Sequence, residues 1–198
     1  MLKIDLKKAY DPIHWTFIQK LLSSLKFPLQ FITCVMACIT TTSFSIQLNV
    51  SLEGYFKGGR GLRKGDPLSP ILFILSMEYL SRLFHVQSQT QGFGFHPNCR
   101  KLKIVQLMFA DDLVLFCKAD KSSVEGLIQA FHKFSHSSGL DANKAKSQVM
   151  LGGCGENTRK IILDITGFGE GGLPFRYLGY LSLQGSLANW NVECKGRK

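Results

Sequence analysis

The chain has 198 residues, which is enough for one domain with a hydrophobic core and too few for two large domains. Hydrophobic residues make up 45% of it, so its composition excludes an intrinsically disordered chain. The formal net charge of +10 favours an anionic partner, of which nucleic acid is the commonest, although a basic chain can also bind a membrane surface or simply be soluble.

The cysteines and the apolar runs exclude two further classes. The six cysteines form no CxxC pair, so a zinc site is not expected, and Cys34 and Cys38 are predicted to be buried together on one helix. The start of the chain has no secretory signal, which predicts reduced thiols and a cytoplasmic or nuclear protein that is not secreted. The longest apolar run, residues 71–77, is too short to span a bilayer and is followed by Glu78, so no transmembrane segment is expected, and a membrane is not among the predicted partners.

The first part of the chain predicts a strand, two helices and a second strand. Residues 3–6 read as a short strand, and Asp11-Pro12 then looks like a helix N-cap followed by a proline at the first helical position. Apolar residues at helical spacing carry this helix towards Pro28, and a second helix is predicted at residues 29–39. From residue 42 to 49 apolar and polar side chains alternate, as in a half-buried strand.

The second part begins with a basic, glycine-rich loop at residues 57–65. Asp66-Pro67 repeats the helix-start signal, and a hairpin is predicted at residues 102–116 with its tip at residues 110–112. The remaining predicted elements are a helix that Ser122 or Ser123 caps and Gly139 ends, a strand at 147–151, and a final strand pair at 173–183. Together they predict an α+β fold, an antiparallel sheet backed by helices.

Asp111 and Asp112 are the most informative residues, because two adjacent carboxylates lie between two apolar runs. Side chains alternate across a strand, so in a regular strand one carboxylate would face the core unpaired, at a high cost. At a tight turn both can reach the end of the sheet. A metal ion such as Mg²⁺, which prefers carboxylate oxygens, is a reason to concentrate them there.

Asp5 is a third carboxylate on another short apolar strand. If the two strands are neighbours, Asp5 and Asp111 could hold two Mg²⁺ ions about 3.5–4 Å apart, as in polymerases and nucleases. Phosphoryl transfer needs positioning and charge neutralisation more than covalent help, which agrees with a site that has no evident nucleophile. The alternative interpretation is that Asp-Asp is only a hairpin turn, since Asp is common in turns.

The carboxylates lie within a series of segments that resembles the reverse transcriptases of non-LTR (LINE-type) retrotransposons, most closely the plant group. These segments follow the order of that family's motifs: Lys3-Ile4-Asp5-Leu6-Lys7-Lys8-Ala9-Tyr10-Asp11, Gly61-Leu62-Arg63-Lys64-Gly65-Asp66-Pro67-Leu68-Ser69-Pro70, Phe109-Ala110-Asp111-Asp112, Ser138-Gly139-Leu140-Asp141-Ala142-Asn143-Lys144-Ala145-Lys146-Ser147 and Leu173-Pro174-Phe175-Arg176-Tyr177-Leu178-Gly179. The resemblance implies a polymerase palm that copies RNA into DNA, with an RNA template, a DNA primer, dNTPs and two Mg²⁺ or Mn²⁺ ions.

The resemblance also implies residue roles. Asp5 and Asp111 would be the principal metal ligands and catalytic residues, with Asp112 beside them. Tyr10 would be the gate that rejects the ribonucleotide 2′-OH, and Gly65, Asp66 and Pro67 would form the wall beside the incoming nucleotide. Lys146 would lie near the triphosphate. Nucleic acid would be contacted by Arg176 and Tyr177 in the primer grip, and by Arg60, Arg63 and Lys64.

Each role has a simpler alternative. Tyr10 could be only a core aromatic residue, Lys146 only a solvated charge, and the basic loop only a soluble loop, although its glycines let backbone amides approach phosphate. His132 and His136 have a possible metal spacing on a helix, but we interpret them as its polar face because no third ligand is evident.

Some features depart from the family. Lys64 stands where the family usually has Gln, and Asn49-Val50 replaces the usual Asn-Gly turn. The fingers and most of the thumb are expected to be missing, so residues 1–165 are predicted to form a truncated palm and residues 166–198 a palm–thumb junction with a divergent basic tail. The fragment is therefore expected to need the missing parts of a longer polyprotein.

Two other functions remain open at this point. The chain could be an inactive retroelement remnant that at most binds nucleic acid, as the departures at Lys64 and at both ends suggest. An unrelated two-metal nuclease or nucleotide cyclase is a weaker alternative, because it does not explain the loop at residues 61–70 or the later motifs.

Overall fold

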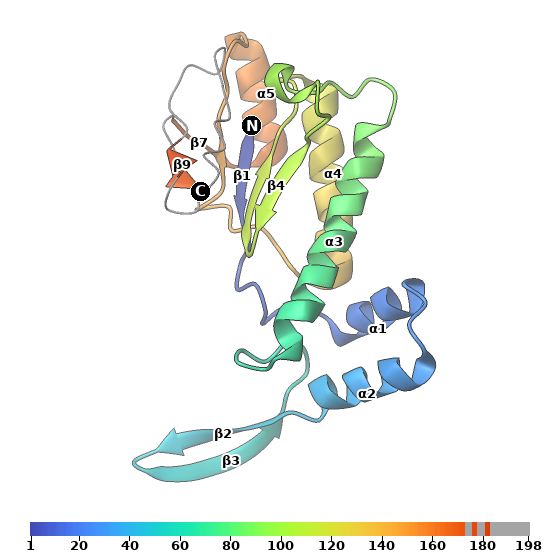
Figure 1. Ribbon diagram of the computed structural model, residues 1–198. Helices are drawn as coiled ribbons and strands as arrows, with labels where there is room; N and C mark the ends of the chain where they lie inside the picture. Colours follow the sequence, from blue (N-terminus) through green and yellow to red (C-terminus); the bar gives the residue numbers. More distant parts are fainter. Residues whose placement is uncertain (173–175, 178–180, 183–198) are drawn as a thin grey trace, which may run out of the picture. The chain divides into compact units, whose positions relative to one another are not determined.

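The computed structural model describes residues 1–172, 176–177 and 181–182 (Figure 1). The chain divides into two compact units. Of the described residues, the first unit comprises 1–7, 81–132, 141–172, 176–177 and 181–182, and the second comprises 8–80 and 133–140. Helices α3 (Leu68–Ser88) and α4 (Lys121–Ser138) each have one part in each unit.

The first unit is built on a five-stranded sheet in the order β4-β5-β1-β6-β7. The central strand β1 is antiparallel to both β5 and β6, whereas β7 is parallel to β6. The predicted antiparallel sheet is therefore confirmed, with one parallel pair at its edge. The strands are β1 (Leu2–Asp5), β4 (Gln106–Phe109), β5 (Asp112–Leu115), β6 (Gln148–Val149) and β7 (Gly169–Glu170).

Helices lie beside this sheet, as the sequence predicts (Figure 1). Helix α5 (Glu156–Thr166) and the parts of α3 and α4 in this unit contribute fully buried apolar side chains. The sheet contributes Leu2, Ile4, Leu113 and Leu115, each no more than 1% exposed. These four side chains share one face, because side chains alternate along a strand and Ile4 pairs with Leu113. In β1 and β5, the face that packs against the helices therefore consists of aliphatic residues.

A second apolar cluster covers part of the other face. Val114 and Phe116 pack there with Met1, Cys99 and Met150, all buried, and Ile104 lies partly buried against them. Cys99 reaches this cluster from the short 3-10 helix η1 (Pro97–Cys99). Both faces of β5 are therefore buried over most of the strand, and only its first residue, Asp112, is half-buried.

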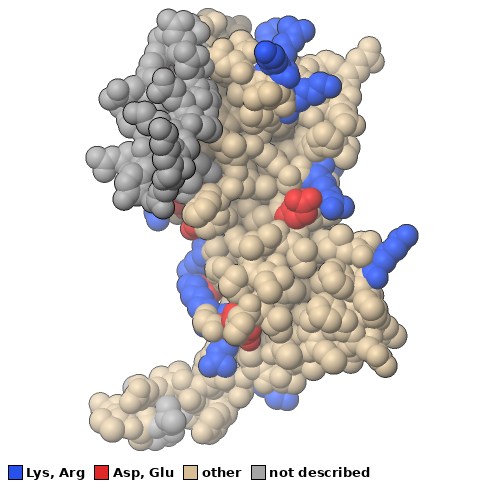
Figure 2. All heavy atoms as spheres, in the orientation of Figure 1, with Lys and Arg blue, Asp and Glu red and all other residues tan. Residues whose placement is uncertain are grey.

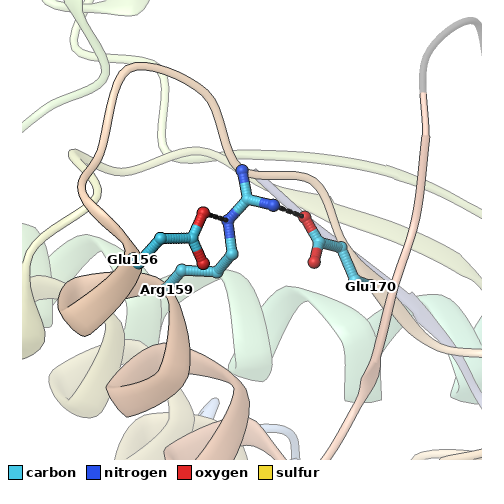
Figure 3. Close-up of polar contacts among 3 residues, drawn as sticks. All are labelled: Glu156, Arg159 and Glu170. Atoms are coloured by element: carbon cyan, nitrogen blue, oxygen red, sulfur yellow. Dashed lines mark ion pairs between the residues drawn. The ribbon is translucent and has the colours of Figure 1, made fainter.

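Arg159 links α5 to the edge of the sheet (Figure 3). Its Nη1 lies 3.0 Å from Glu170 Oε1 on β7, and its Nε lies 3.8 Å from Glu156 Oε1 at the start of α5. The helix ends at Gly167, whose φ of 63° is the left-handed conformation that closes a helix C-terminus. The Arg159–Glu170 contact joins β7 to α5, and because both charges are partly exposed its contribution to stability is small.

The second unit contains helices α1 (Trp15–Ser24) and α2 (Leu29–Thr40), and a hairpin of β2 (Ser43–Leu48) and β3 (Ser51–Lys57). The prediction that Asp11-Pro12 starts the first helix is wrong. The carbonyl oxygens of Tyr10 and Ile13 accept N–H bonds from Leu62 and Gly61, at 2.9 and 2.8 Å. This backbone pairing keeps residues 10–13 out of the helix, which begins at Trp15.

The prediction that Cys34 and Cys38 are buried together is also wrong, since both are exposed. The buried stripe of α2 consists of Ile32, Val35 and Ile39, each no more than 6% exposed. Cys34 and Cys38 fall outside that stripe because β-branched residues at three- and four-residue spacing occupy it. The exposed side of α2, which has no charged residue, therefore carries the side chains of Cys34 and Cys38.

Helix boundaries elsewhere differ from prediction by a residue or two. Asp120, not Ser122 or Ser123, caps α4: its Oδ1 accepts the Ser123 N–H at 2.9 Å. Gly139 ends this helix with a φ of 81°, as predicted. The final strand pair is present as β8 (Arg176–Tyr177) and β9 (Leu181–Ser182), and the rest of residues 173–183 lies outside the described part of the chain.

Candidate catalytic site

Asp5 and Asp112 lie opposite each other on adjacent strands. Asp5 is the last residue of β1 and Asp112 the first of β5, and the two are register partners. Directly opposite residues in an antiparallel pair project to the same face, about 4.5–5.5 Å apart at Cβ. That face is the one opposite Leu113 and Ile4, so both carboxylates avoid the packed core and are half-buried.

Asp111 lies on the two-residue turn between β4 and β5. Ala110 and Asp111 connect Phe109 to Asp112, and Ala110 has a φ of 52°, an unusual conformation for a residue with a Cβ. The Asp111 side chain is exposed, and its carbonyl oxygen accepts the Leu6 N–H at 3.4 Å. The tip predicted at residues 110–112 is confirmed, with Asp112 already within the strand.

A third segment is joined to the same strand end. The Asp5 carbonyl accepts the Asn143 N–H at 2.8 Å, and the Asp5 N–H donates to Ser147 Oγ at 3.2 Å. Lys146, exposed, lies in the turn between these two contacts. The first unit therefore brings Lys146 and the three carboxylates onto adjoining backbone segments. Sequence reasoning missed Asn143 and Ser147, whose contacts depend on strand pairing across the chain.

Among the described residues, none of Asp5, Asp111 and Asp112 forms an ion pair. Within the same part of the chain, no three His, Cys, Asp or Glu side chains converge closely enough to hold a metal ion. The donor chemistry nevertheless suits a hard cation, since carboxylate oxygens are the ligands Mg²⁺ prefers.

Tyr10 belongs to the second unit, where its ring stacks on Phe73 of α3. The ring centroids are 5.0 Å apart, with an interplanar angle of 29°. The ring is half-buried, so Tyr10 is neither fully enclosed in the core nor free to swing.

The loop at residues 57–67 is held by backbone contacts. Trp15 donates from Nε1 to the Gly61 carbonyl at 2.7 Å. The Gly61 backbone has a φ of 92° and runs so close to Asp11 that an added Cβ would lie 2.5 Å from the Asp11 carbonyl oxygen. Trp15 and Gly61 are positioning residues that sequence reasoning missed, because neither contact follows from local spacing.

Charged side chains on this loop point to solvent. Arg60, Arg63 and Lys64 are exposed, and Lys64 Nζ lies 3.9 Å from Asp11 Oδ1, with both side chains more than half exposed. Gly65 has a φ of 88° and an unobstructed surface, and Asp66 Oδ1 accepts the Leu68 N–H at 2.8 Å, which caps α3. Exposed Pro67 follows as predicted, just before the helix.

The remaining predicted site residues lie near the end of the chain. Arg176 and Tyr177 form β8, which pairs with β9, but their side chains are outside the described part of the structure. His132 and His136 are exposed on α4, in agreement with the polar face predicted for them.

Comparison with known proteins decides the family. A model of the family described as "Reverse transcriptase (RNA-dependent DNA polymerase)" matches residues 1–181. The chain belongs to the reverse transcriptase family. The predicted relationship to non-LTR retrotransposon reverse transcriptases is confirmed, since several relatives are retrotransposon polyproteins. The narrower assignment to a plant group stays a prediction.

Three relatives show how much of the chain is shared. The Pol polyprotein of a type-1 R2 retrotransposable element from Nasonia vitripennis is 31% identical over 58% of this chain and 10% of its own length. An uncharacterized mitochondrial protein of Arabidopsis thaliana is 45% identical over 33% of the chain and 54% of its own length. The uncharacterized 149 kDa protein of transposon TX1 from Xenopus laevis is 25% identical over 77% and 11% respectively.

The chain therefore spans only a small part of two of these relatives, 10% of the Nasonia vitripennis polyprotein and 11% of the TX1 protein. Within the described residues, no helix is both long and apolar enough to cross a membrane.

Proposed function

We propose that this chain carries the palm of an RNA-directed DNA polymerase, which extends a DNA primer along an RNA template with dNTPs. Family membership over residues 1–181 supports a reverse transcriptase domain. The observation that carries the proposal is the register pair of Asp5 and Asp112 at the end of β1 and β5, with Asp111 on the adjoining turn. The division into a palm at residues 1–165 and a junction at 166–198 is part of the same proposal.

Asp5, Asp111 and Asp112 would hold the Mg²⁺ or Mn²⁺ ions. Asp5 and Asp112 share one face of the sheet, and Asp111 is exposed, so its side chain can turn towards them without leaving a packed position. When bound, the ions would activate the primer 3′ hydroxyl and stabilise the leaving pyrophosphate. The carboxylates would determine where the ions lie. The pairing of β1 with β5 determines the positions of Asp5 and Asp112.

Three further segments would contact the nucleotide. Lys146 would attract the triphosphate from the turn that is bonded to Asp5. Tyr10, held against Phe73, would exclude a 2′-OH. In the loop at residues 65–67, the left-handed Gly65 leaves the backbone open to a close approach, as a nucleotide wall requires.

The test is primer extension on an RNA template with dNTPs and Mg²⁺. We expect Asp5→Asn and Asp112→Asn each to lower the extension rate at least about a hundredfold, because each removes a ligand charge worth several kcal/mol in the transition state. Asp164→Asn is the matched control: it makes the same charge change at an exposed position on α5 and should leave the rate unchanged.

The assay is run on the 198-residue chain and on a version joined to any coding sequence that flanks it in the genome. Extension by the longer protein alone, with the same dependence on Asp5, would mean that the palm needs neighbouring segments. No extension by either folded protein would reject a polymerase function and favour the remnant that only binds nucleic acid.

A further inference from the structure

The β2–β3 hairpin carries three exposed aromatic side chains. Phe44 and Phe56 are register partners, 42% and 52% exposed, and their rings stack at a centroid distance of 5.7 Å. Tyr55, opposite Ser45, is 80% exposed and projects to the other face. These three residues are called the hairpin platform below.

The hairpin is a separate two-stranded sheet, and no third described strand pairs with it. An isolated hairpin of this kind is only marginally stable in water, and exposed apolar patches in native proteins usually mark a binding surface. These features make the platform a candidate binding surface for a ligand that can cover aromatic rings on a narrow, two-sided ribbon.

The charge distribution indicates what that ligand is. Residues 27–56 contain a single charged residue, Glu53, whereas the eight residues that follow contain Lys57, Arg60, Arg63 and Lys64. All four basic side chains are exposed, and among the described residues only Lys64 has an acidic neighbour, Asp11. On the face that Figure 2 shows, the described atoms at the outer end of the hairpin belong to no Lys, Arg, Asp or Glu.

The basic loop is anchored to the root of the hairpin. The Gly58 N–H donates to the Thr42 carbonyl at 3.1 Å, and a Cβ at Gly58 would lie 3.2 Å from the Phe44 ring. Trp15 then fixes the loop at Gly61. These contacts fix the backbone of the loop beside the root of the hairpin, so its basic residues lie near the platform.

We infer that the hairpin platform and the basic loop bind a single-stranded segment of nucleic acid, with bases stacked on Tyr55 and on the Phe44–Phe56 pair and phosphates beside Lys57, Arg60 and Arg63. Aromatic rings stack on any base face, and a basic groove follows the backbone of the strand. A duplex is disfavoured because its bases are already stacked on one another. The inference deepens the proposed function, on which it rests for the class of ligand.

The test measures fluorescence anisotropy of a labelled oligouridylate bound to the full chain. We expect Tyr55→Leu to weaken binding about 5- to 150-fold, the range for losing one base–aromatic stack, and Tyr55→Phe to retain it. Tyr55 is exposed, so neither change should unfold the chain. Leu29→Ala, at a 77% exposed apolar position on α2, is the control that should have no effect.

Salt titration examines the loop separately. Arg60→Gln with Arg63→Gln should lower the slope of log affinity against log salt by about 0.7 for each phosphate that the loop no longer neutralises. The Tyr55→Leu variant should keep the parent slope while its affinity falls. An RNA duplex of equal length should bind more weakly than the single strand.

Two results would overturn the inference. Binding that depends on Arg60 and Arg63 but not on Tyr55 would leave the platform without a nucleic-acid role, and self-association that Tyr55→Leu abolishes would identify it as a protein contact. Asp164→Asn, at an exposed position on α5 outside the proposed site, should leave the affinity unchanged. If binding persists as inferred while Asp112-dependent primer extension is absent, the proposed polymerase function fails and the platform stands.

Discussion

At Gly61 the backbone passes so close to Asp11 that only a glycine can be accommodated. The residue combines a left-handed φ with a carbonyl that Trp15 binds and an N–H that Ile13 accepts. Three separate contacts therefore meet at a position without a side chain. Glycine at position 61 is therefore required by the fold itself, whether or not the backbone of this loop also binds phosphate.

Gly61→Ala is expected to lower the free energy of unfolding by about 2–5 kcal/mol, because left-handed strain and the overlap with Asp11 add together. Urea denaturation followed by circular dichroism measures the change. Gly59→Ala is the matched control in the same loop, since nothing lies within 4 Å of its added Cβ and its φ is not left-handed. Equal stability of the two variants would contradict the close approach.

At the level of elements, the β2–β3 hairpin has an unfavourable turn. Asn49 and Val50 connect Leu48 to Ser51, and both have positive φ angles, 47° and 74°. Two-residue hairpin turns of this type favour Asn-Gly, and a β-branched residue is strained in the left-handed region. The departure from Asn-Gly in the sequence therefore corresponds to real backbone strain in the structure.

We expect Val50→Gly to stabilise the hairpin by about 0.5–1 kcal/mol, because relief of left-handed strain exceeds the added entropy of glycine in the unfolded chain. Hydrogen exchange of the backbone amides in β2 and β3 measures this directly. Val50→Ala keeps the Cβ and should recover much less. Faster exchange in the glycine variant would show that Val50 stabilises the turn through contacts instead.

At the scale of the whole chain, the first unit is closed by contacts between residues far apart in sequence. The Met1 amino group donates to the Met150 carbonyl at 3.0 Å and is buried beside Cys99 and Cys117. Burial lowers the pKa of this amino group from its ordinary value of 8.0. A charged terminus in that position opposes the packing of the strand that carries Asp5.

The stability of the chain should therefore depend on pH. The unfolded chain keeps the ordinary pKa, so below about pH 8 it binds more protons than the folded chain, and the free energy of unfolding rises as pH approaches 8. N-terminal acetylation should flatten this rise between about pH 7 and 8. Urea unfolding of both forms across that interval measures the two slopes, and equal slopes would contradict the buried charge.

Other buried groups act outside that window. Burial also lowers the pKa of His96 from 6.5, so this group likewise makes the free energy of unfolding rise with pH, but below about pH 6.5. It raises the pKa of the Cys117 thiol to about 11, so stability should fall above about pH 9, where the unfolded thiol ionises. Comparison of acetylated and free chains isolates the amino group from both.

Much of the architecture follows from local pattern. Alternating apolar residues predict β2, the apolar runs around Asp111 predict the β4–β5 hairpin, and Gly139 predicts the end of α4. The family is also readable from the chain, because its motifs combine short, ordered runs of charged, glycine and apolar residues. Such features depend on near neighbours in the sequence, whose geometry the backbone restricts strongly.

Other features depend on contacts between distant segments. Because β1 and β5 are adjacent, Asp5 lies opposite Asp112. From the sequence, the adjacency of these two strands is only an assumption on which the metal site depends. The start of α1 at Trp15 and the burial of α2 away from Cys34 likewise reflect tertiary pairing, which overrides a local capping signal and an apolar composition. Strand order, register and side-chain exposure arise from packing between residues that lie far apart along the chain, and no local spacing encodes them.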